Sequence, residues 1–164
     1  MSSAEPHYLD AKNSTKKQDK KTPKKNFQHV MCFGTFDIFH PGHHYYLSEA
    51  NKHADHMTVV IARDHRVFSG KGRDPIHTET LRRDIVERAF PDAQVILGHE
   101  SDIFAPIREL RPDILVFGYD QKVPEDKIHE LFPNIEIVRV IGHEVEKWKS
   151  SILRNQHIEK DHTK

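Results

Sequence analysis

From residue 27 onward, short apolar runs rich in β-branched residues alternate with longer stretches in which apolar residues recur at helical spacing. This alternation is typical of a parallel sheet built from βαβ units. Five strands are expected, at Gln28 to Phe33, Met57 to Ala62, Gln94 to Leu97, Ile114 to Phe117 and Ile135 to Val140.

Helical spacing fills the stretches between these strands. Helices are expected near Gly42 to His53, Thr78 to Phe90, Ile103 to Leu110 and Glu125 to Leu131, with a last one from about Ser150. Prolines at 75, 91, 112 and 133 punctuate their ends. The pattern therefore predicts an α/β fold, a doubly wound, Rossmann-like five-stranded parallel sheet with helices on both faces. Ligands of such folds bind outside the carboxyl ends of the strands at the switch point, so functional residues are expected in the loops after strands.

The first 26 residues carry seven lysines and almost no apolar side chains. They cannot bury enough surface to offset the entropy of ordering the chain. We expect a disordered tail at residues 1–26, one folded domain at 27–155 and a flexible end at 156–164. Aromatic residues are not interleaved with the lysines, so RNA binding by this tail would be accessory at most.

Charge and cysteine content limit the partners and the cellular compartment that are expected for the protein. The chain of 164 residues has 25 basic and 25 acidic side chains, which gives no general attraction to nucleic acid or to an anionic membrane. Any binding of phosphate must then depend on a few basic residues at one site and not on the net charge of the protein. Cys32 has no cysteine partner and lies in an apolar run, which favours a buried structural thiol in a reducing compartment. No apolar stretch approaches the roughly 20 residues of a membrane span, and the start lacks an apolar signal core, so a cytoplasmic protein is expected.

The segment after the first expected strand carries the chemistry. It reads Gly34-Thr35-Phe36-Asp37-Ile38-Phe39-His40-Pro41-Gly42-His43 and passes into a helical pattern. Glycines at a turn allow a phosphate to approach the backbone, and a helix start directs unpaired N–H groups at an anion. Two imidazoles three residues apart can donate hydrogen bonds to charge that develops during phosphate transfer.

This segment resembles the signature of the cytidylyltransferase-like nucleotidyltransferase superfamily, and the resemblance extends over nearly all of residues 28 to 154. It implies transfer of a nucleoside monophosphate from a nucleoside triphosphate to a small phosphorylated acceptor, with release of pyrophosphate and no covalent enzyme intermediate. It also implies that His40 and His43 stabilise the transition state at the α-phosphate. The expected catalytic residues are His40, His43 and Lys71.

Three further segments resemble the family pattern. Lys71-Gly72-Arg73-Asp74-Pro75 resembles the basic loop that meets a phosphate, and Gly118-Tyr119-Asp120-Gln121 resembles the loop that holds the nucleotide. Lys149-Ser150-Ser151-Ile152-Leu153-Arg154 resembles a helix start for the β- and γ-phosphates, although Lys149 replaces a hydroxyl residue of the usual pattern. The resemblance assigns to the nucleotide Gly34, Thr35, Phe36, Asp37, Gly42, Gly118, Tyr119, Asp120, Gln121, Ser150, Ser151 and Arg154, and to the acceptor or its phosphate Arg63, Arg73 and Arg82.

Among members of the superfamily, the Gly118 to Gln121 segment, together with Val60 to Asp64 and Asp102 to Phe104, is most similar to archaeal-type FAD synthases, which transfer AMP from ATP to FMN. Cytidylyl transfer from CTP to glycerol 3-phosphate or a similar phosphorylated alcohol is the alternative, and a non-catalytic nucleotide-binding module is a distant third. Mg²⁺ is expected to arrive with the triphosphate, because no dedicated metal cluster is visible. Asp37 is either a contact to that metal through water or a hydrogen-bonding turn residue. A homodimer is expected from the superfamily.

Deletion of residues 1 to 24 is expected to leave the melting temperature and the turnover of the protein almost unchanged. The segment has no apolar face with which to dock on the folded domain. Parallel thermal unfolding and initial-rate measurements on the full and shortened chains test this, and a large loss of activity would refute the assignment of these residues as a tail.

Overall fold

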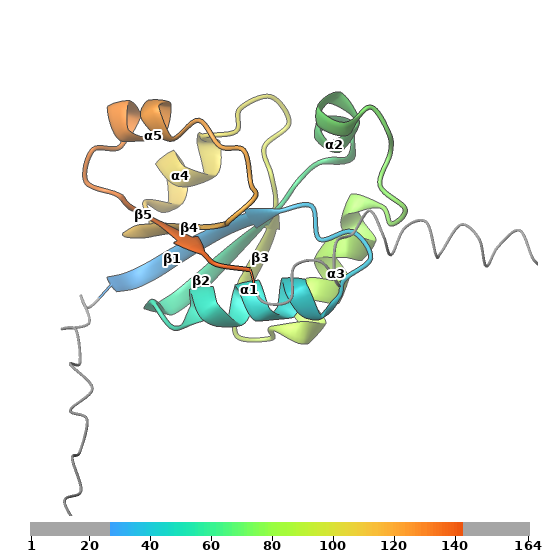
Figure 1. Ribbon diagram of the computed structural model, residues 1–164, viewed down its shortest axis with the longest axis horizontal. Helices are drawn as coiled ribbons and strands as arrows, with labels where there is room; N and C mark the ends of the chain where they lie inside the picture. Colours follow the sequence, from blue (N-terminus) through green and yellow to red (C-terminus); the bar gives the residue numbers. More distant parts are fainter. Residues whose placement is uncertain (1–26, 143–164) are drawn as a thin grey trace, which may run out of the picture.

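A computed structural model of the protein describes residues 27–142 and contains one five-stranded sheet (Figure 1). Its strands are β1 (Phe27–Gly34), β2 (Ala54–Ile61), β3 (Gln94–Leu97), β4 (Ile114–Gly118) and β5 (Glu136–Val140). All neighbouring strands pair in parallel, in the order β3-β2-β1-β4-β5. The chain moves outward from β1 to β3 and then crosses back to β4, so the switch point lies between β1 and β4. The predicted doubly wound fold is confirmed.

Helices cover both faces of the sheet. In Figure 1, α1 (Pro41–Asn51) and α3 (Glu79–Ala89) lie on one face, whereas α4 (Ala105–Leu110) and α5 (Glu125–Leu131) lie on the other. The remaining helix of the described region, α2 (Asp64–Lys71), stands beyond the carboxyl edge of the sheet rather than on a face. Since the strands are covered on both sides, they form the continuous apolar runs seen in the sequence.

Two hydrophobic clusters hold these layers together, one on each face. Val30 and Cys32 of β1 belong to the cluster that includes the buried residues of α1 and α3, whereas Met31 belongs to the cluster with Ile107 and Ile128 of α4 and α5. Successive residues of β1 thus point to opposite faces, as the pleat of a strand requires. Burial raises the pKa of the Cys32 thiol to about 12, so the thiol stays protonated, which supports the structural role expected for it.

Sequence pattern alone missed α2. Only Val67 of its eight residues is buried, so the segment has no apolar stripe from which a helix is predicted. The helix ends at Gly72, whose φ of +68° is left-handed and whose N–H binds the Phe68 carbonyl. Lys71, expected in a loop, is therefore the last residue of a helix. The helix expected from Ser150 lies outside the described residues.

Among residues 27–142, the helices are all too short or too polar to cross a bilayer.

Candidate active site

A cleft of about 830 Å³ opens at the carboxyl edge of the sheet, at the switch point between β1 and β4. Three segments line most of it: the β1–α1 loop from Gly34 to His43, the α2 region from Arg66 to Pro75, and the β4–α5 loop from Gly118 to Val123. Nearly all of the site residues expected within the described chain meet here. This location agrees with the general rule for doubly wound sheets.

The β1–α1 loop is held in an unusual backbone conformation. Phe36 and Ile38 have φ values of +53° and +48°, in the left-handed region that side chains with a Cβ disfavour. The Phe36 ring is buried and folds back over Gly34, where an added Cβ would lie 2.7 Å from two ring carbons. Gly34 is thus required for the packing of Phe36, a different reason from the phosphate approach inferred from the sequence.

His40 and His43 lie together at the start of α1. His40 is the N-cap residue, and its Nδ1 accepts the backbone N–H of Gly42 at 3.1 Å. The rings of His40 and His43 stack with centroids 3.7 Å apart and planes inclined by 23°. With Nδ1 of His40 accepting, the neutral ring carries its proton on Nε2. The pairing expected from the H-x-G-H spacing is present in the fold.

Burial favours the neutral form of both imidazoles. Burial, followed by the nearby His40 and Lys71, lowers the pKa of His43 to about 3, and burial also lowers the pKa of His40. Nδ1 of His43 is buried and has no hydrogen-bond partner among residues 27–142. Desolvation and then the charge of Arg73 lower the pKa of Lys71. The site therefore concentrates positive charge and neutral donors without a cationic imidazole.

Cations approach the cleft from α2 and the loop after it. Lys71 and Arg73 line it, as expected, and so does Arg66. Arg66 was not predicted from the sequence as a site residue because it lies within α2, which the sequence pattern did not reveal. Its position five residues before Lys71 becomes informative only once α2 is known to be helical.

Arg82 is placed differently from the expectation. Its side chain is fully buried in α3 and does not line the cleft. Its guanidinium donates to the carbonyls of Thr35, Ala62 and His77 at 2.5, 2.8 and 3.0 Å, and to the Asp64 carboxylate at 2.6 Å. The structure favours a supporting role for Arg82 beneath the cleft over a direct grip on phosphate.

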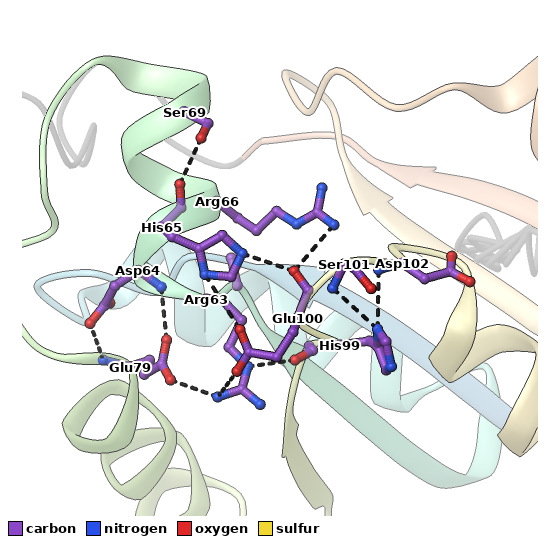
Figure 2. A network of polar contacts seen from close by, with 12 residues as sticks. Arg63, Asp64, His65, Arg66, Ser69, Glu79, His99, Glu100, Ser101 and Asp102 are labelled. Atoms are coloured by element: carbon purple, nitrogen blue, oxygen red, sulfur yellow. Dashed lines mark hydrogen bonds and ion pairs between the residues drawn. The ribbon is translucent and has the colours of Figure 1, made fainter.

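Arg63 is likewise engaged by protein groups. Figure 2 shows its guanidinium between Glu79 and Glu100, with Nη1 at 2.7 and 3.2 Å from their carboxylate oxygens. Its Nε donates to the Gly98 carbonyl at 2.6 Å. Arg63 does not line the cleft, so it fastens the start of α2 to the β3–α4 loop.

Asp37 receives the backbone N–H groups of Ile76 and His77 at 2.9 and 3.0 Å. These contacts favour the turn role over the metal role, because both carboxylate oxygens are directed at the loop before α3. Among residues 27–142, no group of three or more His, Cys, Asp and Glu side chains is arranged to hold a metal ion.

The β4–α5 loop is braced from below. The Gln121 amide accepts the Gly118 N–H at 2.7 Å and donates to the Phe33 carbonyl at 2.6 Å, which ties the ends of β4 and β1 together. Arg139 of β5, which the sequence did not single out, donates to the carbonyls of Gly118 and Gln121. Tyr119 and Asp120 are left on the cleft surface. Ser150, Ser151 and Arg154 lie outside the described residues.

Comparison with known proteins agrees with this geometry. Residues 31–160 match the protein family described as Cytidylyltransferase-like. FAD synthase from Aciduliprofundum boonei is 46% identical over 101 residues, which cover 62% of this chain and 67% of that protein. FAD synthase from Picrophilus torridus is 40% identical over 134 residues, which cover 79% and 96%.

A solved structure has the same fold. It is described as a lipopolysaccharide core biosynthesis protein from Thermoplasma volcanium, and it is 35% identical with a TM-score of 0.67. The match covers 73% of this chain and all of that one.

The placement of Arg82 leads to a stability prediction. Arg82→Met is expected to lower the free energy of unfolding by about 3 kcal/mol or more, because three carbonyls and a carboxylate lose a charged, buried donor. Urea unfolding measures the loss, and Arg88→Met, at an exposed site of the same helix, is the control. A stable Arg82→Met protein that has lost only affinity for its substrates would show that Arg82 contacts a ligand after all.

Proposed function

Because this chain belongs to the cytidylyltransferase-like family, we propose that it is a nucleotidyltransferase that transfers AMP from ATP to FMN, forming FAD and pyrophosphate. The observation that carries the proposal is the stacked, neutral His40–His43 pair at the first turn of α1, inside the switch-point cleft. FAD synthases that align with most of this chain support the choice of ATP and FMN.

The reaction needs one bond made and one broken. A phosphate oxygen of FMN attacks the α-phosphorus of ATP, and the bond from that phosphorus to the bridging oxygen of the β-phosphate breaks, so pyrophosphate departs with the electron pair. A phosphate dianion is already nucleophilic, so no strong general base is required. Catalysis then consists of positioning and of stabilising negative charge in the transition state.

The His40–His43 pair suits that task. A neutral imidazole N–H donates a hydrogen bond to a developing anion. The pKa of about 3 keeps His43 in this neutral form across the neutral pH range. The N-terminus of α1 adds the positive end of a helix dipole at the same point. Lys71 and Arg73 add positive charge at the cleft wall, where an incoming phosphate offsets their mutual repulsion.

The nucleotide would occupy the opposite, β4 side of the cleft. The Gly118 to Gln121 loop is braced by Arg139 and by the end of β1, so its exposed Tyr119 and Asp120 are presented on a fixed backbone. A preformed loop lowers the ordering cost of binding a base and ribose.

Mg²⁺ enters this proposal as part of the substrate, the magnesium complex of ATP. The described residues offer no carboxylate cage, and Mg²⁺ is commonly bound mainly through substrate phosphates and water. A homodimer and a cytoplasmic location stay predictions.

The alternative that the sequence left open is cytidylyl transfer to glycerol 3-phosphate or a similar phosphorylated alcohol. The same histidine pair and cations would serve it, because the chemistry at the α-phosphorus is identical. A non-catalytic nucleotide-binding module is disfavoured by the intact pair of histidines in the cleft.

Purified protein with ATP, Mg²⁺ and FMN is expected to form FAD and pyrophosphate faster than CTP reacts with glycerol 3-phosphate or phosphocholine. Chromatographic detection of the products, with a coupled pyrophosphate assay, measures both rates under the same conditions. Faster cytidylyl transfer would establish the alternative, and no transfer by a folded protein would favour the binding module.

His43→Ala is expected to lower kcat by about 10²–10³, since one preorganised donor to the transition state is lost. The KM for nucleotide should change far less, so kcat and kcat/KM fall together. His129→Ala, at an exposed position of α5, is the matched control. If His43 were only structural, the variant would melt at a markedly lower temperature while its folded fraction kept normal turnover.

A further inference from the structure

The side of α2 that faces the cleft has a composition that folding alone does not explain. Arg66, Val67, Gly70 and Lys71 line the cleft, and their spacing of i, i+1, i+4 and i+5 places them on one side of a helix. A Cβ at Gly70 would meet no atom within 4 Å, and Gly70 does not have the left-handed φ found at Gly72. Glycine at this helical position therefore costs stability without relieving any clash. What it provides is open space between Arg66 and Lys71.

Arg66 differs from Arg63 and Arg82 in its hydrogen bonds. Its Nε is buried and has no hydrogen-bond partner among residues 27–142. Its Nη2 is 3.5 Å from the Glu100 carbonyl, at the long limit for a hydrogen bond. Figure 2 shows the side chain reaching from α2 toward the β3–α4 loop. A buried charged donor without a strong partner is costly, and a ligand that supplies an acceptor removes the cost.

We propose that Arg66 binds the phosphate group of the acceptor substrate and that Gly70 leaves the space through which this phosphate reaches the histidine pair. The inference rests on the proposed nucleotidyltransferase function and assigns within it a residue that determines acceptor preference. A guanidinium donates in a fork to two oxygens of one phosphate, which a lysine at the same place does not reproduce.

The topology favours the acceptor over the nucleotide as the partner of Arg66. The strand order places β2 on one side of β1 and β4 on the other. The loop for the nucleotide follows β4, whereas α2 follows β2, and the reacting histidines stand between them at the end of β1. With the base and ribose assigned to the β4 side, the α2 side is left for the acceptor. Ile103 is 47% exposed, lines the cleft and belongs to the β3–α4 loop, which His65 and Arg66 of α2 contact at the Glu100 carbonyl. It offers an apolar surface for the body of the acceptor.

Comparison of FMN with riboflavin isolates the phosphate contribution, because the two flavins differ only in that group. Flavin fluorescence titrations of the full chain are expected to show tighter binding of FMN. They are done with an ATP analogue that has a methylene group in place of the α–β bridging oxygen, so that the bond broken in the reaction cannot be cleaved. In Arg66→Ala the preference for FMN over riboflavin should fall roughly 10- to 100-fold, the effect of one or two charge-assisted hydrogen bonds. Arg66→Lys should recover part of it, and Arg88→Ala should leave it unchanged.

Steady-state rates separate the acceptor from the nucleotide. Arg66→Ala is expected to raise the KM for FMN by a similar factor while the KM for ATP changes little. A rise in the KM for ATP alone would place Arg66 on the polyphosphate and overturn the proposal. The proposal would also be overturned if Arg66→Ala and Arg88→Ala had the same preference for FMN over riboflavin and the same KM for FMN.

Gly70→Ala provides an independent test on the same surface. The alanine should raise the melting temperature slightly, since it favours the helix and meets no neighbour, yet it should lower kcat/KM for FMN. Unchanged kcat/KM in this more stable variant would show that the space at Gly70 is not used.

Failure of this inference is distinguishable from failure of the proposed function. If the wild-type chain forms no FAD but transfers CMP to glycerol 3-phosphate, the proposed acceptor is wrong. The same variants, compared with glycerol 3-phosphate against glycerol, then decide the role of Arg66. If the wild type binds FMN and riboflavin equally and reacts with neither phosphorylated acceptor, both proposals fall.

Discussion

The geometry of the cleft depends on the hydrogen bonds that the buried guanidinium of Arg82 donates. Its four hydrogen bonds join the β1–α1 loop at Thr35, the residue after β2 at Ala62, the loop before α3 at His77 and the first residue of α2 at Asp64. Thr35 is 47 positions from Arg82 in the sequence, and Ala62 is 20 positions away. The loops that Arg82 joins include those that line the cleft. A cation with several directed donors can satisfy carbonyls that would otherwise be buried without partners, and no apolar side chain can do so. The cleft is therefore assembled around a polar centre, although the sheet below it is apolar.

Strain and desolvation are built into the loop that this centre supports. Phe36 and Ile38 adopt left-handed backbone conformations, and the Phe36 ring closes over Gly34 and contacts His43 edge-on. Such conformations persist only where the surrounding packing enforces them, and they are common at functional sites. The Phe36 ring packs against His43, and burial lowers the pKa of His43 and favours its neutral form. Backbone strain, aromatic packing and the charge state of the site are thus parts of one arrangement.

The charged residues around the cleft divide into those that hold it and those that face into it. The first group donates its hydrogen bonds to carbonyls and carboxylates of the protein and consists of Arg63, Arg82 and Arg139. Lys71 and Arg73 line the cleft, and Arg66 has a buried Nε without a partner in the described chain. A phosphorylated substrate that enters from the α2 side meets the second group, whereas the first group fixes the loops. Rigid support combined with available charge is the arrangement that electrostatic catalysis requires, because the donors need no reorganisation as charge develops.

The amino-acid sequence by itself determined the five strands, the helices that cover both faces and the histidine pair. These features are encoded locally: strands buried on both faces form continuous apolar runs, and His40 and His43 are three residues apart on one helix start. The sequence did not reveal α2, since a helix that stands at the edge of the sheet buries only Val67 and has no apolar stripe. Nor did it distinguish the roles of Arg63, Arg66 and Arg82. All three have the same side chain, and what separates them is the set of oxygens that the fold brings within reach, contributed by residues up to 47 positions away. Only the tertiary structure decides which guanidinium donates to oxygens of the protein and which can donate to a ligand. The reason is that the acceptors around each side chain come from several segments that the fold brings together.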